Sequence, residues 1–255
     1  MKTVTVFVTK GGAGRSTAVM ALSCGFLALG KHVVVMDCTG QVGWKMGHEI
    51  STTLGAWGSQ MQTSNLLPGR LELIQCHSQR QVVDEWAAAK TRGFDLLLFD
   101  TQHRLEDHQS AALGLADLIV APATGAFEAR CTASSIQDIL GFSEHLFGLV
   151  TGCRNGCFEI AETRAAFRDI SVFLSALPFS EALADLTLIG DVKRFASSLS
   201  CKNEDPGFAR YQGALATWHA VQQLTYEVQW ALNGQRLQSF DAEIPQFAFQ
   251  GGAVA

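Results

Sequence analysis

Residues 3–29 read TVTVFVTKGGAGRSTAVMALSCGFLAL, and this stretch decides the fold. Its first part, residues 3–9, is rich in β-branched side chains and predicts a buried strand. The apolar run after the glycines predicts a helix over 16–30. Between them lies KGGAGRST, residues 10–17, whose glycines allow a tight turn. A strand, a glycine-rich turn and a helix N-terminus form a nest of backbone N–H groups that suits phosphate oxygens.

The same alternation of short apolar runs and helical stretches continues along the chain. The runs barely alternate between polar and apolar residues, which is typical of strands buried on both faces of a parallel sheet. The predicted strands are 3–9, 32–37, 71–76, 95–100, 117–122, 146–151 and 171–177. The predicted helices are 16–30, 79–91, 106–116, 127–143 and 158–169. This order predicts an α/β fold: a doubly wound, mostly parallel sheet of seven or eight strands with helices on both faces.

The length of 255 residues, with 47% hydrophobic and 17% charged residues, predicts one globular domain over 1–233. Residues 206–233 carry a long amphipathic pattern, which fits either a helix that closes the core or one that docks a partner. Residues 41–70 are rich in Gly, Ser, Thr and Gln, so we expect an irregular surface excursion there. The tail 234–255 lacks periodicity and is expected to be loose.

The net charge and the cysteines bear on which partners and which cellular compartment the chain suits. The net charge of -5 is spread without long like-charge runs, so no sequence-wide basic field indicates nucleic acid or acidic lipid. The seven cysteines are an odd number and widely spaced, which suits a reducing cytoplasm. Cys153 and Cys157 have no second pair or flanking histidine, so we expect structural thiols and no metal there. The longest near-apolar stretch is too short to span a bilayer, and we expect no membrane association.

Individual residues of the loop can be given roles in binding phosphate and Mg²⁺. Gly11, Gly12 and Gly14 permit the turn, Ser16 stands where a hydroxyl can ligate Mg²⁺, and Thr17 can reach the α-phosphate side. The general phosphate-loop pattern is imperfect here. Its first glycine is Thr9, and the lysine that normally reaches the β- and γ-phosphates is replaced by Arg15.

The run Lys10-Gly11-Gly12-Ala13-Gly14, followed by a basic residue and Ser-Thr, resembles the deviant Walker A motif of the ParA/MinD superfamily of P-loop ATPases. In that family the early lysine reaches across a nucleotide-sandwich homodimer to the partner's phosphates, and the resemblance gives this role to Lys10. The whole loop, Lys10, Gly11, Gly12, Ala13, Gly14, Arg15, Ser16 and Thr17, is then the expected nucleotide-binding segment.

Two further segments resemble the family. HVVVMDCTGQ, residues 32–41, is similar to its second strand, and FDLLLFDTQ, residues 94–102, is similar to its Walker B strand. Asp37 and Asp100 end these strands, where a carboxylate can hold Mg²⁺ through water or, alternatively, cap the next helix. For the adenine, the resemblance implies the loops at 151–155 and at Pro178 and Phe179.

The resemblance covers residues 1–233 and implies an ATP-dependent homodimer that positions or partitions DNA or a protein cargo. KGGAG, the GFD…FDT segment and the length are most similar to the ParA relative encoded in the virulence region of plant-transforming bacteria, which assists DNA transfer. Basic residues in the C-terminal half are interleaved with acidic ones, so non-specific DNA binding and solvated helix faces remain open alternatives. The candidate DNA-binding cations are Arg164, Arg168, Lys193, Arg194, Lys202 and Arg210.

Three departures from the family pattern concern hydrolysis, for which the catalytic candidates are Lys10, Arg15 and Asp37. Relatives carry a second acidic residue where this chain has Thr39, and threonine cannot act as a general base at neutral pH. Arg15 is planar and forked where a compact ammonium is usual. Gln102 replaces the usual proline. Two hypotheses follow: a weak, slow ATPase, or a degenerate relative that docks a partner with little or no nucleotide. A third class, an enzyme acting on a small metabolite, is not supported, because the sequence contains no second group of catalytic residues.

Overall fold

The computed structural model describes residues 1–39, 43–45, 48–50, 52–63, 70–140, 144–154, 157–199 and 207–237. A seven-stranded sheet in the order β5-β2-β6-β1-β7-β8-β9 forms its centre. The strands are β1 (Lys2–Val6), β2 (Val33–Asp37), β5 (Leu71–Gln75), β6 (Leu96–Asp100), β7 (Leu118–Ala123), β8 (Leu146–Cys153) and β9 (Ser171–Pro178). All seven predicted strands are confirmed. Within the described residues, no helix is both long and apolar enough to cross a bilayer.

Every pairing in this sheet is parallel, which confirms the predicted fold class. The four innermost residues of β1 and all of β2 and β6 are buried, as expected for β-branched and leucine-rich runs covered on both faces. Since all strands point the same way, their carboxyl ends meet at one edge. Loops that follow the strands therefore converge there, where open α/β sheets bind ligands.

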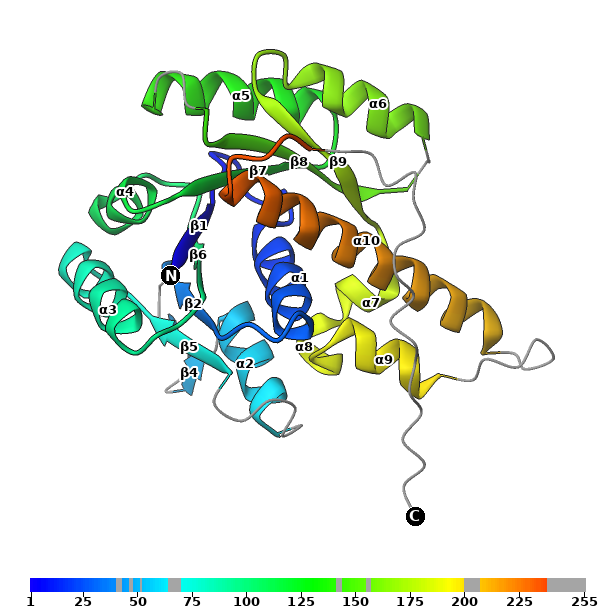
Figure 1. Ribbon diagram of the computed structural model, residues 1–255, viewed down its shortest axis with the longest axis horizontal. Coiled ribbons are helices and arrows are strands. Elements are labelled where there is room, and N and C mark those ends of the chain that lie inside the picture. Colours follow the sequence, from blue (N-terminus) through cyan, green and yellow to red (C-terminus); the bar gives the residue numbers. More distant parts are fainter. Residues whose placement is uncertain are drawn as a thin grey trace.

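Helices cover both faces of the sheet (Figure 1). The described helices of one face are α1 (Arg15–Ala28), α2 (Thr53–Thr63), α7 (Glu181–Ala184), α8 (Leu186–Ile189), α9 (Val192–Ser198) and α10 (Phe208–Leu232). Those of the other face are α3 (Gln79–Thr91), α4 (Asp107–Gly114), α5 (Ala126–Leu140) and α6 (Cys157–Ala166). Helix α10 buries Trp218, Val221, Leu224 and Val228 in the core, so the core-closing interpretation of the C-terminal pattern is confirmed.

The prediction of an irregular excursion over 41–70 is wrong for its central part. Residues 53–63 form α2, which buries Leu54, Trp57 and Met61, and the Trp57 Nε1–H donates to the Gly190 carbonyl at 2.7 Å. These three side chains share one helical face, but the two glycines in this helix are poor helix formers and hide the period. A short antiparallel hairpin, β3 (Gly43–Lys45) and β4 (His48–Ile50), precedes it. Residues 40–42, 46–47, 51 and 64–69, and the tail from 238, lie outside the described residues.

Candidate functional site

The glycine-rich loop between β1 and α1 is shaped by two left-handed glycines. Gly12 has φ 88° and Gly14 has φ 78°, a region that side chains other than glycine rarely adopt. A Cβ on Gly14 would also lie 3.2 Å from the Thr151 Oγ1. That hydroxyl donates a hydrogen bond of 2.9 Å to the Ala13 carbonyl, which ties the loop to the end of β8. The loop is therefore held in one shape before any ligand arrives.

The N-terminus of α1 faces this loop without a capping side chain. Gly14 occupies the N-cap position, makes no side-chain cap, and no acidic residue lies in the first turn. The Ala18 N–H donates to the Gly14 carbonyl at 2.8 Å, whereas earlier N–H groups of a helix have no partner within it. Free N–H groups and the positive end of the helix dipole together favour an anion.

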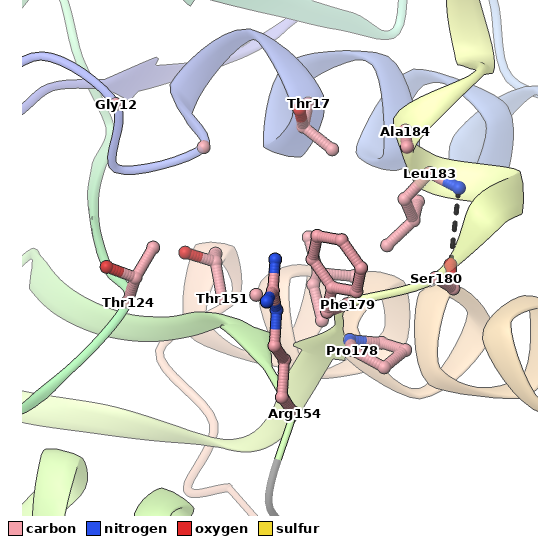
Figure 2. A pocket seen from close by; sticks show the side chains of 13 residues that line it. Gly12, Thr17, Thr124, Thr151, Arg154, Pro178, Phe179, Ser180, Leu183 and Ala184 are labelled. Carbon is pink, nitrogen blue, oxygen red and sulfur yellow. Dashed lines mark hydrogen bonds between the residues drawn. The ribbon is translucent and has the colours of Figure 1, made fainter.

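A cavity of about 440 Å³ opens beside the loop, and Figure 2 shows the side chains around it. It is lined by Gly12, Gly14, Thr17, Thr124, Thr151, Gly152, Arg154, Leu177, Pro178, Phe179, Ser180, Leu183 and Ala184. The structure thus brings the loop together with the predicted base-binding residues Pro178 and Phe179. The Arg154 guanidinium carbon lies 4.0 Å from the centre of the Phe179 ring. Thr124, which sequence reasoning missed, directly follows β7, so its position at a strand end was the available signal.

Ser16 and Asp100 meet below the loop. The Ser16 hydroxyl donates to Asp100 Oδ2 at 2.5 Å, while Asp100 Oδ1 is buried and has no hydrogen-bond partner among the residues that the structure describes. Burial raises the pKa of Asp100 to about 7. An orphaned buried carboxylate oxygen beside a serine hydroxyl fits a Mg²⁺ ion or one of its waters, because hard cations take oxygen ligands. Among the described residues, no group of three or more His, Cys, Asp or Glu side chains could hold a metal. Such an ion would therefore draw its remaining ligands from phosphate and water.

Asp37, the other predicted metal residue, has a different environment. It pairs in register with Asp100, and both are buried. Its Oδ1 accepts hydrogen bonds from the Thr39 N–H at 2.9 Å and from the Thr39 hydroxyl. Its Oδ2 accepts one from the Thr52 hydroxyl at 2.5 Å. Both oxygens of Asp37 are thus engaged by protein donors, and Thr52 is a partner that the sequence did not indicate.

The two basic residues of the loop are not among the residues that line the cavity. Lys10 is exposed; its Nζ lies 3.8 Å from the Glu128 Oε1 and 5.7 Å from the centre of the Phe127 ring. The Arg15 guanidinium donates to the Thr101 carbonyl, just after β6, and burial lowers the pKa of Arg15. Arg15 therefore connects the loop to the end of β6, and it does not line the described cavity.

Comparison with known proteins identifies the family. The family model described as VirC1 protein matches residues 1–146. The chain belongs to the VirC1 family. Its membership confirms the predicted relationship to the ParA/MinD superfamily, and the matched segment contains the glycine-rich loop and both strand-end aspartates of this VirC1-family chain. No curated protein sequence matches the chain significantly.

Solved structures share the fold of the VirC1-family chain. MinD in the MinC:MinD cell division complex of Aquifex aeolicus superposes with a TM-score of 0.62 at 12% identity, covering 94% of this chain and 98% of that one. MinD of Pyrococcus horikoshii, complexed with Mg-ADP, gives 0.55 at 15% identity, covering 88% and 96%. A variant of McdA from Cyanothece in complex with ATP gives 0.51 at 15% identity, covering 94% and 98%. At these identities the similarity establishes the fold.

Proposed function

We propose that this VirC1-family chain is a ParA-like protein whose single domain, residues 1–233, binds ATP or ADP with Mg²⁺. The observation that carries the proposal is the pairing of an uncapped helix N-terminus with a buried carboxylate oxygen that has no hydrogen-bond partner among the described residues. The first attracts phosphate and the second attracts a cation, and Ser16 connects them through its bond to Asp100. A nucleotide with Mg²⁺ presents both charges.

The roles of the residues follow from their positions. Backbone amides of residues 10–17 surround the phosphates, and Thr17 approaches the α-phosphate side. Ser16 and Asp100 hold Mg²⁺, which when bound neutralises phosphate charge. The base enters the cavity beside Phe179, where the guanidinium of Arg154 already stacks. An aromatic ring and a guanidinium are both surfaces on which a purine stacks.

The sheet edge at the carboxyl ends of the strands, where the glycine-rich loop lies, also has the features of a dimer surface. Four large apolar side chains follow successive strands there and are exposed: Leu105 (44%), Phe127 (66%), Phe158 (80%) and Phe179 (56%). They follow β6, β7, β8 and β9, so the parallel sheet gathers them at one edge. Exposed aromatic side chains around a charged site support a second copy as partner, in a nucleotide-sandwich homodimer. Exposed Lys10 lies at the same edge, and in the dimer it contacts the partner's phosphates.

Hydrolysis by this dimer is slow. Phosphoryl transfer depends on positioning the attacking water, and Thr39 offers a hydroxyl where relatives have a carboxylate. A second candidate is nucleotide binding without turnover. It is supported by two hydrogen bonds that engage the altered residues, from the Thr39 hydroxyl to Asp37 and from Arg15 to the Thr101 carbonyl. In either case the bound nucleotide controls docking of a DNA or protein cargo.

Two of the candidate DNA-binding cations already bind other groups of the protein. Arg164 donates to the Leu174 carbonyl, and Arg210 forms an ion pair with Glu181. Lys202 lies outside the described residues. These engagements leave less free positive charge for phosphates, so they support a protein cargo over non-specific DNA. The five cysteines whose side chains the structure describes are all free thiols, which supports action in a reducing cytoplasm.

Calorimetric titration with ATP, with and without Mg²⁺, tests the binding. The Gly14→Ala variant should bind ATP at least about tenfold more weakly, because its Cβ is strained at φ 78° and crowds Thr151. Gly213→Ala is the matched control: Gly213 lies in α10, and a Cβ there meets nothing within 4 Å. If the wild-type protein releases no heat with millimolar nucleotide, the proposal fails. A turnover assay on the same samples separates the slow ATPase from the non-hydrolysing form.

A further inference from the structure

Two cysteines directly follow neighbouring strands beside the candidate nucleotide site. Strands β2 and β5 run in parallel register up to the pair Asp37 and Gln75, and Cys38 and Cys76 come next. The Cys76 N–H continues the ladder by donating to the Asp37 carbonyl at 2.9 Å. Neighbouring strands lie about 4.8 Å apart, and disulfide-linked residues have Cα atoms about 4.4–6.8 Å apart. The backbone therefore holds the two residues at a separation that a disulfide can bridge.

The two side chains also face the same way. Both are fully buried and belong to one cluster, with Met36 from β2 and Val82 from α3. The two thiols therefore lie beside each other inside the fold, at the ends of neighbouring strands.

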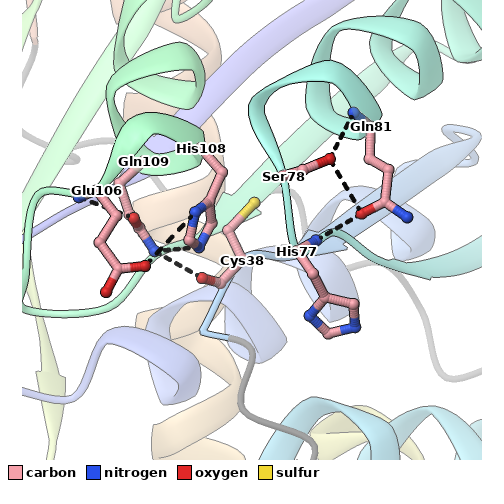
Figure 3. A network of polar contacts seen from close by, with 7 residues as sticks. All are labelled: Cys38, His77, Ser78, Gln81, Glu106, His108 and Gln109. Atoms are coloured by element: carbon pink, nitrogen blue, oxygen red, sulfur yellow. Dashed lines mark hydrogen bonds and ion pairs between the residues drawn. The ribbon is translucent and has the colours of Figure 1, made fainter.

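Cys38 also sits at the end of β2, between Asp37 and Thr39. Its N–H donates to the Asp100 carbonyl at 2.8 Å, and its carbonyl accepts from the Gln109 Nε2–H at 2.8 Å. Figure 3 shows Cys38 between the segment that carries His77 and the start of α4, which carries Gln109. Any movement of Cys38 toward β5 would pull on the backbone of Asp100.

We propose that Cys38 and Cys76 are a modification site at which hydrogen peroxide forms a disulfide, and that this bond weakens nucleotide binding at the neighbouring site. One of the two sulfurs, as a thiolate, attacks one peroxide oxygen, the O–O bond breaks, and a sulfenic acid and hydroxide result. The other cysteine's sulfur then attacks the sulfenic sulfur, and the S–O bond breaks. Hydroxide leaves and, with the thiol proton, becomes water. In total, two thiols and one peroxide give one disulfide and two waters.

The geometry explains the choice of oxidant and the effect. Hydrogen peroxide is small enough to reach the two buried cysteines, whereas a larger oxidant such as glutathione disulfide is excluded by its size. A disulfide brings the Cβ atoms to about 3.8 Å, closer than neighbouring strands hold them, so Cys38 is drawn toward β5. This strains its bonds to Asp100 and Gln109. The effect on affinity rests on the proposed function, whereas formation of the disulfide does not.

The test treats the folded full-length protein with hydrogen peroxide, traps free thiols with iodoacetamide, and maps peptides by mass spectrometry without reduction. We expect a mass loss of about 2 Da, a peptide linking Cys38 to Cys76, and reversal by dithiothreitol. Cys76→Ser and Cys38→Ser should each abolish the linked peptide. Cys131→Ser, in α5 and away from the pair, should form it as the wild type does.

The outcomes separate the two parts of the proposal. If the wild-type protein retains both thiols, or oxidises other cysteines first, the modification site is refuted, whether or not the serine variants fold. If the disulfide forms, calorimetry should show ATP affinity falling about tenfold and recovering on reduction. Unchanged affinity in the oxidised form refutes the regulatory part. If the reduced protein binds no ATP while the disulfide still forms, the proposed function fails and the modification site stands.

Discussion

The ends of β2 and β6 lie side by side, carry the same residue, and differ in how that residue is satisfied. At the end of β6, Asp100 accepts a hydrogen bond from Ser16 of the glycine-rich loop on one oxygen, and its other oxygen is buried with no partner in the described part of the chain. At the end of β2, Asp37 accepts from Thr39 and Thr52 on both oxygens. In the proposed function, the first carboxylate receives a cation that arrives with a nucleotide, whereas the second stabilises the fold. The proposal therefore keeps the residues for binding and places the difference from the family at the residues for hydrolysis.

The largest effect should come from substituting the two aspartates separately. Asp100→Asn should reduce Mg²⁺-dependent ATP affinity about 100-fold, or about 3 kcal/mol, because the amide cannot replace the anionic oxygen. Asp37→Asn should instead lower the free energy of unfolding by about 1–3 kcal/mol, since it disrupts bonds from Thr39 and Thr52, and should change affinity little. Calorimetry and chemical denaturation measure the two quantities. Equal losses of affinity in both variants would show that the aspartates do not divide the roles in this way.

The nucleotide-free protein should become less stable as the pH rises through the range of Asp100. The pKa of this group is about 7 in the folded protein because of burial, against an ordinary value of 3.8. The unfolded chain therefore releases the proton near pH 4, while the folded chain keeps it until about pH 7. Stability from this group is present below pH 4 and should fall by about 2 kcal/mol between pH 5 and 7. Denaturation curves for wild type and Asp100→Asn should differ in slope with pH; identical slopes would refute the assignment to Asp100.

The sequence predicted the position of Asp100 better than it predicted the environment of Asp37. Repeated apolar strands and the glycine-rich loop are local patterns, so all seven strands and the position of Asp100 could be read directly. The partners of Asp37 could not. Thr52 comes just before a helix that was missed because glycines and small or polar residues separate Leu54, Trp57 and Met61. The hydrogen bond of Arg15 could not be predicted either. Its acceptor is the backbone carbonyl of Thr101, and every residue has such a carbonyl, so residue types do not indicate which one accepts.

Restoring the residues usual in the family should increase ATP turnover if Thr39 and Arg15 are what slows it. The double variant Thr39→Asp with Arg15→Lys returns a carboxylate and a compact ammonium to the altered part. We expect ATP turnover to rise about tenfold, because a carboxylate can orient or deprotonate the attacking water. Arg15→Lys alone is the matched control and should raise turnover less. Phosphate release measured over hours reports the rate, and a double variant that binds ATP but turns over no faster would place the deficiency elsewhere.

The smallest effect should appear at the far end of the cavity, where Phe179 meets Arg154. Phe179→Ala removes one stacking surface for the base and should weaken ATP binding about fivefold, which corresponds to about 1 kcal/mol. Binding of inorganic tripolyphosphate should not change, since the phosphate loop is untouched. Leu188→Ala removes another exposed apolar side chain, outside the described cavity lining, and should affect neither ligand. A parallel loss for ATP and tripolyphosphate would mean that Phe179 supports the phosphate loop, and the base would then have to lie against other residues.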